Sequence, residues 1–334
     1  MCNSNKKILL TGVTPSGHPH LGNYIGAIRP AIKLSQSSEY TSRYFISDYH
    51  SLVKLWDPSL RNEYTYSIAA SWLACGLDPN NVLFYRQSDI PEIMELNWIL
   101  STVSAKGLLN RAHAYKSQVD KNIIENDPDK GITMGLFNYP ILMAADILAF
   151  NANIVPVGKD QIQHIEIARD IANRFNHIYK TKILTPPEAY IDNNSETILG
   201  LDGRKMSKSY GNTIPLFSTE KQLRKAIMKI KTNSLLPGEP KETNNCTIYK
   251  LYQSFASKIE IEDFKTKYEQ GLGWGDAKKI LYEKINSELT PYRNEYNTLM
   301  QDKSKIDLIL NDGAKKAREI TIPLINKIRK KIGI

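Results

Sequence analysis

Two stretches of the sequence combine residue types that suit phosphate binding. The first spans residues 11–24 and contains Thr14-Pro15-Ser16 and His20-Leu21-Gly22-Asn23. It follows the apolar run 8–10 and precedes an amphipathic segment, which predicts a strand, a turn and the start of a helix. Unpaired N–H groups at a helix start attract anions, and His18 and His20 add further donors. A plain turn with exposed histidines would explain this stretch equally well.

The second stretch is the run Lys205-Met206-Ser207-Lys208-Ser209. Two lysines three residues apart stand beside two hydroxyl groups, and glycines flank the loop on both sides. Such a loop could close on a triphosphate and neutralise the departing pyrophosphate. Most basic runs are simply solvated, so an exposed loop without a ligand is the alternative.

A carboxylate interrupts the apolar helix predicted for residues 134–150. Tyr139, Met143, Asp146 and Phe150 share one face at helical spacing, and we expect Pro140 to start or tilt the helix. Burying a carboxylate costs several kcal/mol, roughly, unless a donor meets it. The donor could be a structural partner elsewhere in the fold, or an N–H or O–H group on a flat ligand ring.

A third turn is formed by Gly158-Lys159-Asp160-Gln161, between an expected strand at 152–157 and a helix reaching about residue 179. Gly158 would let the backbone approach a ligand closely, and Asp160 suits the N-cap of the helix. An ordinary strand-to-helix turn with a conventional cap is the alternative.

The elements that carry these residues predict an α/β fold. Apolar strands at 8–10, 43–47, 82–85 and 152–157 alternate with helices at 24–34, 58–77, 93–110 and 134–150. This pattern indicates a parallel sheet covered on both faces. Residues 11–16, 48–50 and 87–89 would then share the carboxyl edge of the sheet, where such folds bind ligands. The polar segment 117–130 is expected to be a mobile surface loop.

The character of the sequence changes near residue 217. Lysine-rich helices are expected at 220–231, 247–255, 261–269, 274–289 and 291–301, followed by a turn at 311–313 and a final helix at 314–331. The prediction is therefore a Rossmann-like parallel-sheet domain (1–217), then a smaller all-helical domain (218–310). The C-terminal helix (311–334) would pack back toward the first domain.

Composition narrows the classes of partner. The 334 residues carry a net charge of +9, which favours a polyanionic partner, although a solvated lysine face would also explain it. The three cysteines, Cys2, Cys75 and Cys246, have no metal-binding spacing and suggest a reducing compartment. No apolar run is long enough to cross a bilayer. We expect a cytoplasmic protein without a metal site of its own.

Taken together, the loops resemble a known family. The runs at 20–23 and 205–209 are similar to the two signature motifs of class I aminoacyl-tRNA synthetases, with Asn23 where many members carry a second histidine. Residues 15–24, 48–50, 139–148 and 155–176 narrow the resemblance to the bacterial tryptophanyl branch, and the similarity covers nearly the whole catalytic half. A weaker likeness continues at 312–314.

The resemblance implies a role for each matching residue. Tryptophan would be bound by Asp146, which accepts the indole N–H, and by Leu10, His50, Tyr139, Met143, Val155, Val157 and Gln161. ATP would be bound by Thr14, Pro15, Ser16, His20, Gly22, Asn23, Gly158, Lys159, Asp160, Ile198, Lys205, Met206, Ser207, Lys208 and Ser209. The residues implied to be catalytic are His20, Lys116, Lys205 and Lys208.

Three positions depart from the family pattern. Leu10 stands where phenylalanine is common, Thr14 where glutamine is common, and Lys159 where glutamate is common. These differences bear on the individual contacts and leave the resemblance intact.

The implied reaction joins tryptophan to tRNA(Trp) through an adenylate, with ATP and its bound Mg²⁺ as substrate, in a homodimer. A tyrosyl-tRNA synthetase is the nearest alternative, because an aspartate accepts a phenol O–H equally well. A nucleotidyltransferase that ignores tRNA and a non-catalytic RNA-binding relative are further alternatives.

Overall fold

A five-stranded parallel sheet forms the centre of the protein, whose computed structural model describes residues 6–123, 127, 129–191 and 197–334. The strand order is β3-β2-β1-β4-β5, with every neighbouring pair parallel. The strands are β1 (Lys7–Val13), β2 (Tyr40–Ile46), β3 (Leu83–Arg86), β4 (Ile154–Pro156) and β5 (Glu188–Tyr190). The strand order reverses direction between β1 and β4, the point at which doubly wound sheets bind ligands. The predicted α/β class is confirmed.

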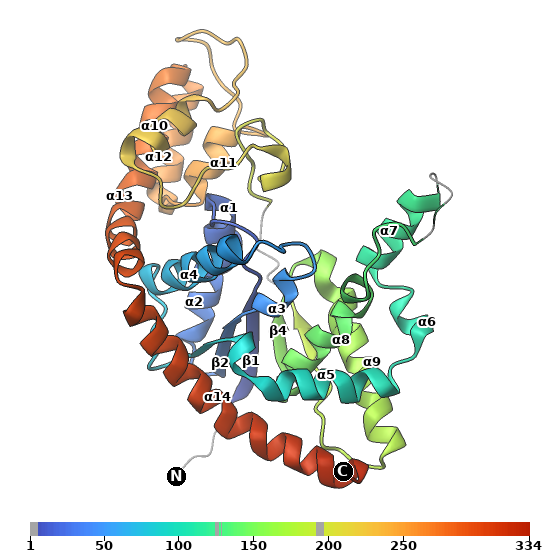
Figure 1. Cartoon of the computed structure of the whole chain (residues 1–334). Helices are drawn as coiled ribbons and strands as arrows, with labels where there is room; N and C mark the ends of the chain where they lie inside the picture. The colour runs from blue at the N-terminus through green and yellow to red at the C-terminus, as the bar shows by residue number, and fades with distance from the viewer. Residues whose placement is uncertain (1–5, 124–126, 128, 192–196) are drawn as a thin grey trace.

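Helices connect the strands and cover both faces of the sheet (Figure 1). The first, α1 (Leu21–Asn23), continues through a π-helical turn (Tyr24–Ile28) into α2 (Arg29–Ser35). The others in the N-terminal half are α3 (Asp48–Ser51), α4 (Pro58–Ala74), α5 (Pro91–Val103), α6 (Lys106–Leu109), α7 (His113–Ile123), α8 (Met134–Leu148) and α9 (Ile162–Ile178).

Strand alternation divides the core into two clusters, one on each face of the sheet. Neighbouring residues of one strand enter opposite clusters, as in the pairs Leu9 and Leu10, Tyr44 and Phe45, and Phe84 and Tyr85. Both members of each pair are buried, because helices lie on both faces. This arrangement explains why the strands read as continuous apolar runs rather than as alternating ones.

The remainder of the chain is helical, comprising α10 (Glu220–Met228), α11 (Thr247–Gln253), α12 (Lys258–Glu269), α13 (Trp274–Gln301) and α14 (Lys303–Ile332). The apolar side chains of α10 to α13 join the cluster on one face of the sheet, so this core is continuous with that of the N-terminal half. Figure 1 shows α13 leading down from this helical group and α14 passing beside the sheet. Among the described residues, no helix is both long enough and apolar enough to cross a membrane.

Helix α14 covers the edge strand β3 and lies against α5. Three ion pairs fix it there: Arg318 with Glu92 at 2.9 Å, Arg329 with Glu95 at 2.5 Å, and Arg86 of β3 with Asp307 at 3.0 Å. Gly313 brings the two backbones together, since a Cβ at that position would lie 1.8 Å from the Phe84 carbonyl oxygen. The turn predicted at 311–313 is therefore wrong, because the glycine serves close packing inside a continuous helix.

Several other boundaries were also predicted wrongly. Strand β5, which follows Pro186-Pro187, was not among the predicted strands. The helix expected at 93–110 divides into α5 and α6, because Ser104 and Ala105 adopt extended backbone angles. Residues 117–123 belong to α7 rather than to a loop, and Tyr115 anchors this helix edge-to-face on Phe137 of α8, with 4.9 Å between ring centroids. Residues 124–126 and 128 of that expected loop lie outside the described residues.

Two prolines lie inside helices. Pro140 does not start α8, which covers most of the predicted 134–150, and Pro291 does not begin a new helix. Pro140 lies within α8, whose first turn is capped by Thr133, and Pro291 lies within the single helix α13 rather than between two helices. Helix α13 packs on α4 at one end and on α10 and α11 at the other, and these contacts outweigh the local cost of the proline.

The packing of α14 on β3 yields a stability prediction. Replacing Gly313 with alanine should lower the free energy of unfolding by about 2 kcal/mol or more, because the new methyl group would overlap a backbone carbonyl that cannot move aside. Urea unfolding would measure the change. Gly107→Ala is the matched control, since no atom lies within 4 Å of its added Cβ. Equal midpoints for the two variants would show that α14 does not need this close approach.

Candidate active site

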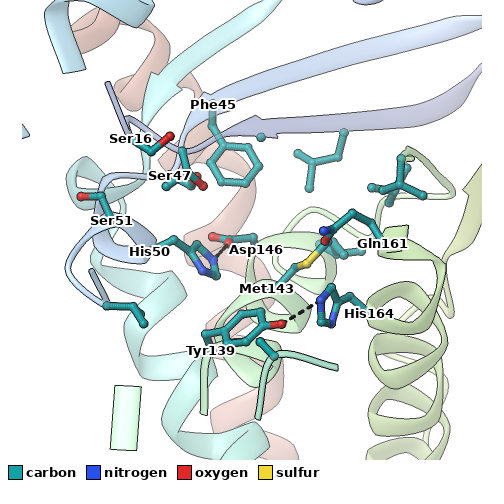
Figure 2. Close-up of a pocket in the computed structure, with 18 of the residues that line it drawn as sticks. Ser16, Phe45, Ser47, His50, Ser51, Tyr139, Met143, Asp146, Gln161 and His164 are labelled. Carbon is teal, nitrogen blue, oxygen red and sulfur yellow. Dashed lines mark hydrogen bonds and ion pairs between the residues drawn. The ribbon is translucent and has the colours of Figure 1, made fainter. Parts of the chain in front are cut away.

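A cavity of ≈ 840 Å³ opens at the carboxyl ends of β1, β2 and β4 (Figure 2). Its wall includes all eight residues that the sequence assigned to the amino acid: Leu10, His50, Tyr139, Met143, Asp146, Val155, Val157 and Gln161. Thr14, Ser16 and Gly158 from the predicted ATP set line it too. Side chains from segments more than 100 residues apart in the sequence therefore meet at the sheet's switch point.

Asp146 is the most buried ionisable group of this cavity, with 1% of its surface exposed. His50 Nε2 lies 2.9 Å from its Oδ2, and Gln87 Nε2 donates to Oδ1 at 2.7 Å and to Oδ2 at 2.9 Å. Burial raises the pKa of Asp146, while the contacts with His50 and Gln87 act in the opposite direction. Asp146 thus has partners within the fold, His50 and Gln87, and its carboxylate also lines the cavity.

Tyr139 and His164 form a second polar pair in the wall. The Tyr139 hydroxyl lies 2.8 Å from His164 Nε2, and the two rings meet edge-to-face (Figure 2). Burial raises the pKa of Tyr139 to about 12 and lowers the pKa of His164. Both side chains are thus held neutral, which suits hydrogen bonding to a charged ammonium group.

The loop that follows β1 is fixed by its own hydrogen bonds. Asn23 Oδ1 accepts from the His20 backbone N–H at 3.0 Å, and the Leu21 N–H donates to the Ile214 carbonyl at 2.8 Å. Burial, together with a smaller effect of the nearby Lys208 ammonium, lowers the pKa of His20 to about 4. His18, whose role the sequence left open, lies 3.0 Å from Ser67 Oγ and 3.0 Å from the Glu63 carboxylate.

The lysine loop packs against this first loop. The Gly22 N–H lies 3.3 Å from the Met206 sulfur, and a Cβ at Gly17 would lie 2.8 Å from Lys208 Nζ. Gly17 has a φ of +133°, so a side chain there would be strained as well as crowded. The lysine loop and the loop after β1 therefore lie in direct contact.

Buried Asn212 shapes the lysine loop. Its Oδ1 accepts from the Ser207 N–H at 2.8 Å, and its Nδ2 donates to Asp202 Oδ1 at 2.7 Å and to the Lys205 carbonyl at 3.1 Å. The hydrogen bond from Asn212 is the largest influence that lowers the pKa of Asp202, to about 2. Ser207 and Ser209 face each other, with 2.8 Å between their hydroxyl oxygens.

The remaining predicted residues do not line this cavity, and they differ in exposure. Lys205, Lys159 and Asp160 are exposed, Lys116 is exposed on α7, Ile198 is half-buried, and Pro15 is buried. Asp160 does not cap α9, which begins at Ile162 after a 3₁₀ turn, with Gln161 at the N-cap position. Its carboxylate instead lies beside Gly158, where an added Cβ would be 2.6 Å from Oδ1.

Three residues in or beside the cavity were absent from the predicted site. Gln87 holds Asp146, His164 holds Tyr139, and Phe45 lies in the wall opposite Gly12. The position of Gln87 at a strand end was a usable signal, as was the place of His164 three residues beyond Gln161. Nothing in the sequence pattern distinguished Phe45 from an ordinary core residue.

Comparison with known proteins gives consistent results. Residues 3–290 match the family model described as tRNA synthetases class I (W and Y). A tryptophan–tRNA ligase of Neisseria meningitidis is 53% identical over 332 residues, covering 99% of this chain and 98% of the relative, and one of Xylella fastidiosa (strain Temecula1) is 55% identical, covering 98% and 75%. The crystal structure of a Campylobacter jejuni tryptophanyl-tRNA synthetase complexed with ADP and tryptophan superimposes with a TM-score of 0.90 at 43% identity, covering 98% of this chain and 100% of that one.

The environment of His20 predicts a pH effect on stability. Because the pKa of His20 falls from 6.5 to about 4 on folding, the unfolded chain binds more protons between these values. The stabilising contribution is complete above pH 6.5 and is lost as the pH falls toward 4. In His20→Gln, the melting temperature should therefore fall less than in the wild type as the pH is lowered from 6.5 to 4. The control is His177→Gln, at an exposed position on α9; a wild-type slope in His20→Gln would contradict the assignment.

Proposed function

The chain belongs to the class I tRNA synthetases of the W and Y family, and on that premise we propose how its residues perform the reaction. It is an ATP-dependent aminoacyl-tRNA ligase whose amino acid is tryptophan. The observation that carries the choice of amino acid is its identity of more than 50% to tryptophan–tRNA ligases over nearly the whole chain. Tyrosine was the alternative, because an aspartate can also accept a phenol O–H, and these relatives do not favour it.

The indole N–H of tryptophan would donate to Asp146. A carboxylate has about four acceptor positions, and His50 and Gln87 account for three contacts, which leaves capacity for a ligand. The apolar side chains Leu10, Met143 and Val155 line the same cavity and would contact the ring faces. A flat ring with one donor matches a pocket with apolar walls and one buried acceptor.

The amino group of tryptophan would bind to Tyr139 and Gln161. Both side chains line the cavity, and His164 fixes the Tyr139 hydroxyl from the far side. A neutral His164 can accept a hydrogen bond from the Tyr139 hydroxyl, which leaves the lone pairs of the Tyr139 oxygen available to an ammonium group. This arrangement would leave the substrate carboxylate free to react.

ATP would bind along the two loops that meet above the sheet. Thr14, Ser16, His20, Gly22 and Asn23 would contact its phosphates, Gly158 and Asp160 its ribose, and Ile198 its adenine. The packing of Met206 on Gly22 and of Lys208 on Gly17 supports this placement, because it brings the lysine loop to the phosphate end. We assign Pro15, Lys159, Ser207 and Ser209 to the same surface.

Activation proceeds by in-line displacement. A tryptophan carboxylate oxygen forms a bond to the α-phosphorus of ATP while the bond from that phosphorus to the bridging oxygen breaks, releasing pyrophosphate. Lys205 and Lys208, with Lys116, would stabilise the charge that develops on the leaving group. A ribose hydroxyl of tRNA then attacks the acyl carbon, an ester forms, AMP leaves and the hydroxyl proton is released.

Four further proposals rest mainly on the family resemblance. Mg²⁺ would arrive bound to the phosphates of ATP. The basic helices of residues 218–310 would contact the anticodon end of tRNA(Trp), where a positive surface supplies phosphate contacts. The chain would act as a cytoplasmic homodimer. Residues 1–217 would form the catalytic domain, with 311–334 packed back on it.

Pyrophosphate exchange tests the choice of substrate. The protein should exchange ATP and pyrophosphate with tryptophan and not with tyrosine. Asp146→Asn should raise the KM for tryptophan roughly 10- to 100-fold, because it removes a charged acceptor from the indole N–H, and should leave the KM for ATP unchanged. Exchange supported by tyrosine alone would reject the proposed specificity.

The lysine loop gives a separate prediction. Lys208→Ala should lower kcat for exchange about 100- to 1000-fold while the Kd for tryptophan, measured by calorimetry, stays unchanged, since the charge acts on the leaving group. Lys33→Ala, at an exposed position on α2, is the matched control. Normal adenylate formation in Lys208→Ala would remove this residue from the mechanism.

A further inference from the structure

Three residues form a row across neighbouring strands at the base of the active site. Gly12 of β1 is in register with Phe45 of β2, and Phe45 is in register with Tyr85 of β3. Residues in register on parallel strands project to the same face of a sheet. This face is the one that carries the cavity, because Leu10, Phe45 and Tyr85 all belong to the core cluster on that side.

Phe45 extends from β2 into the wall of the cavity. Figure 2 shows its ring directed toward the region of Asp146 and His50. Tyr85 supports it in a stacked arrangement, with 5.7 Å between ring centroids and an interplanar angle of 13°. Phe45 is 6% exposed, whereas Tyr85 behind it is fully buried, so Phe45 is the member of this pair that meets the cavity.

Gly12 makes room for the ring. A Cβ on Gly12 would lie 2.5 Å from Cζ and 2.7 Å from Cε1 of Phe45, closer than real atoms approach. Gly12 is not among the glycines with positive φ, so its backbone conformation does not itself require glycine. The absence of a side chain at position 12 is therefore explained by the space that Phe45 occupies.

We propose that Phe45 is a specificity-determining residue that forms the aromatic wall against which the ring of the amino-acid substrate packs. Gly12 is then a positioning residue that acts through Phe45. The proposal rests on the proposed function, and it adds a contact that the motif residues do not supply. Asp146 would select the N–H group at the edge of the substrate ring, while Phe45 would provide flat contact area for a ring of indole size.

Truncating the ring tests this role. Phe45→Leu should raise the Kd for tryptophan, measured by calorimetry on the full chain, and its KM in pyrophosphate exchange by about 3- to 10-fold. The KM for ATP should stay unchanged. Phe150→Leu is the matched control, because Phe150 belongs to the same core cluster and is equally buried but does not line the cavity.

A purely structural role gives a different result. If Phe45 only fills the core, both variants should lose thermal stability while keeping the wild-type Kd for tryptophan. An unchanged Kd in a folded Phe45→Leu variant would overturn the proposal. Failure of the wild type to exchange with tryptophan would instead overturn the proposed function, so the two failures are distinguishable.

A double-mutant cycle tests the role of Gly12. Gly12→Ala should displace Phe45 and raise the Kd for tryptophan in the wild-type background, with a smaller effect in the Phe45→Leu background, where the shorter side chain can move aside. Gly275→Ala, with no atom within 4 Å of its added Cβ, is the control and should leave the Kd unchanged. Equal effects of Gly12→Ala in both backgrounds would show that Gly12 does not act through Phe45.

Discussion

The burial of the Asp146 carboxylate is the constraint on which the active site depends. A charge with 1% exposure is tolerated only when donors meet it, and His50 and Gln87 come from the ends of two other strands to do so. The sheet must therefore align β2 and β3 with helix α8 before the pocket exists. The same carboxylate retains capacity for one more donor at the cavity surface. The carboxylate that needs partners within the fold is thus also the one that faces the cavity.

The parallel sheet brings the loops of the site together. Because all strands run in the same direction, their carboxyl ends share one edge, and the loops after β1, β2 and β4 converge there. The switch in strand order between β1 and β4 separates the helices on the two faces and leaves the cavity between them. Helix α14 protects the exposed edge at β3, where Gly313 permits contact between backbones. The site therefore depends on residues far outside its own motifs.

The lysine loop is largely exposed, and hydrogen bonds rather than burial fix its backbone. Asn212 holds its backbone, and Met206 and Lys208 contact the first loop through Gly22 and Gly17. Lys205 and Lys208 are exposed, so their charge would be available to the phosphates in the proposed mechanism. The cavity wall, in contrast, is held by hydrogen bonds between side chains that are buried or half-buried, such as that of Tyr139 with His164.

Local patterns in the sequence predicted the α/β class, the first four strands and the loops at their carboxyl ends, because apolar runs bounded by turns are visible without a structure. The residues assigned to the amino acid came from the family resemblance, and the cavity wall contains all eight of them among others that were not predicted. Tertiary structure alone decided that Gln87 holds Asp146 and that Phe45 projects beside Gly12. It also decided that residues 117–123 form a helix on α8 and that α13 and α14 run unbroken through Pro291 and Gly313. Each of these features depends on a contact with a residue distant in the sequence. Such contacts produce no periodic pattern or fixed spacing, so they cannot be predicted from one sequence.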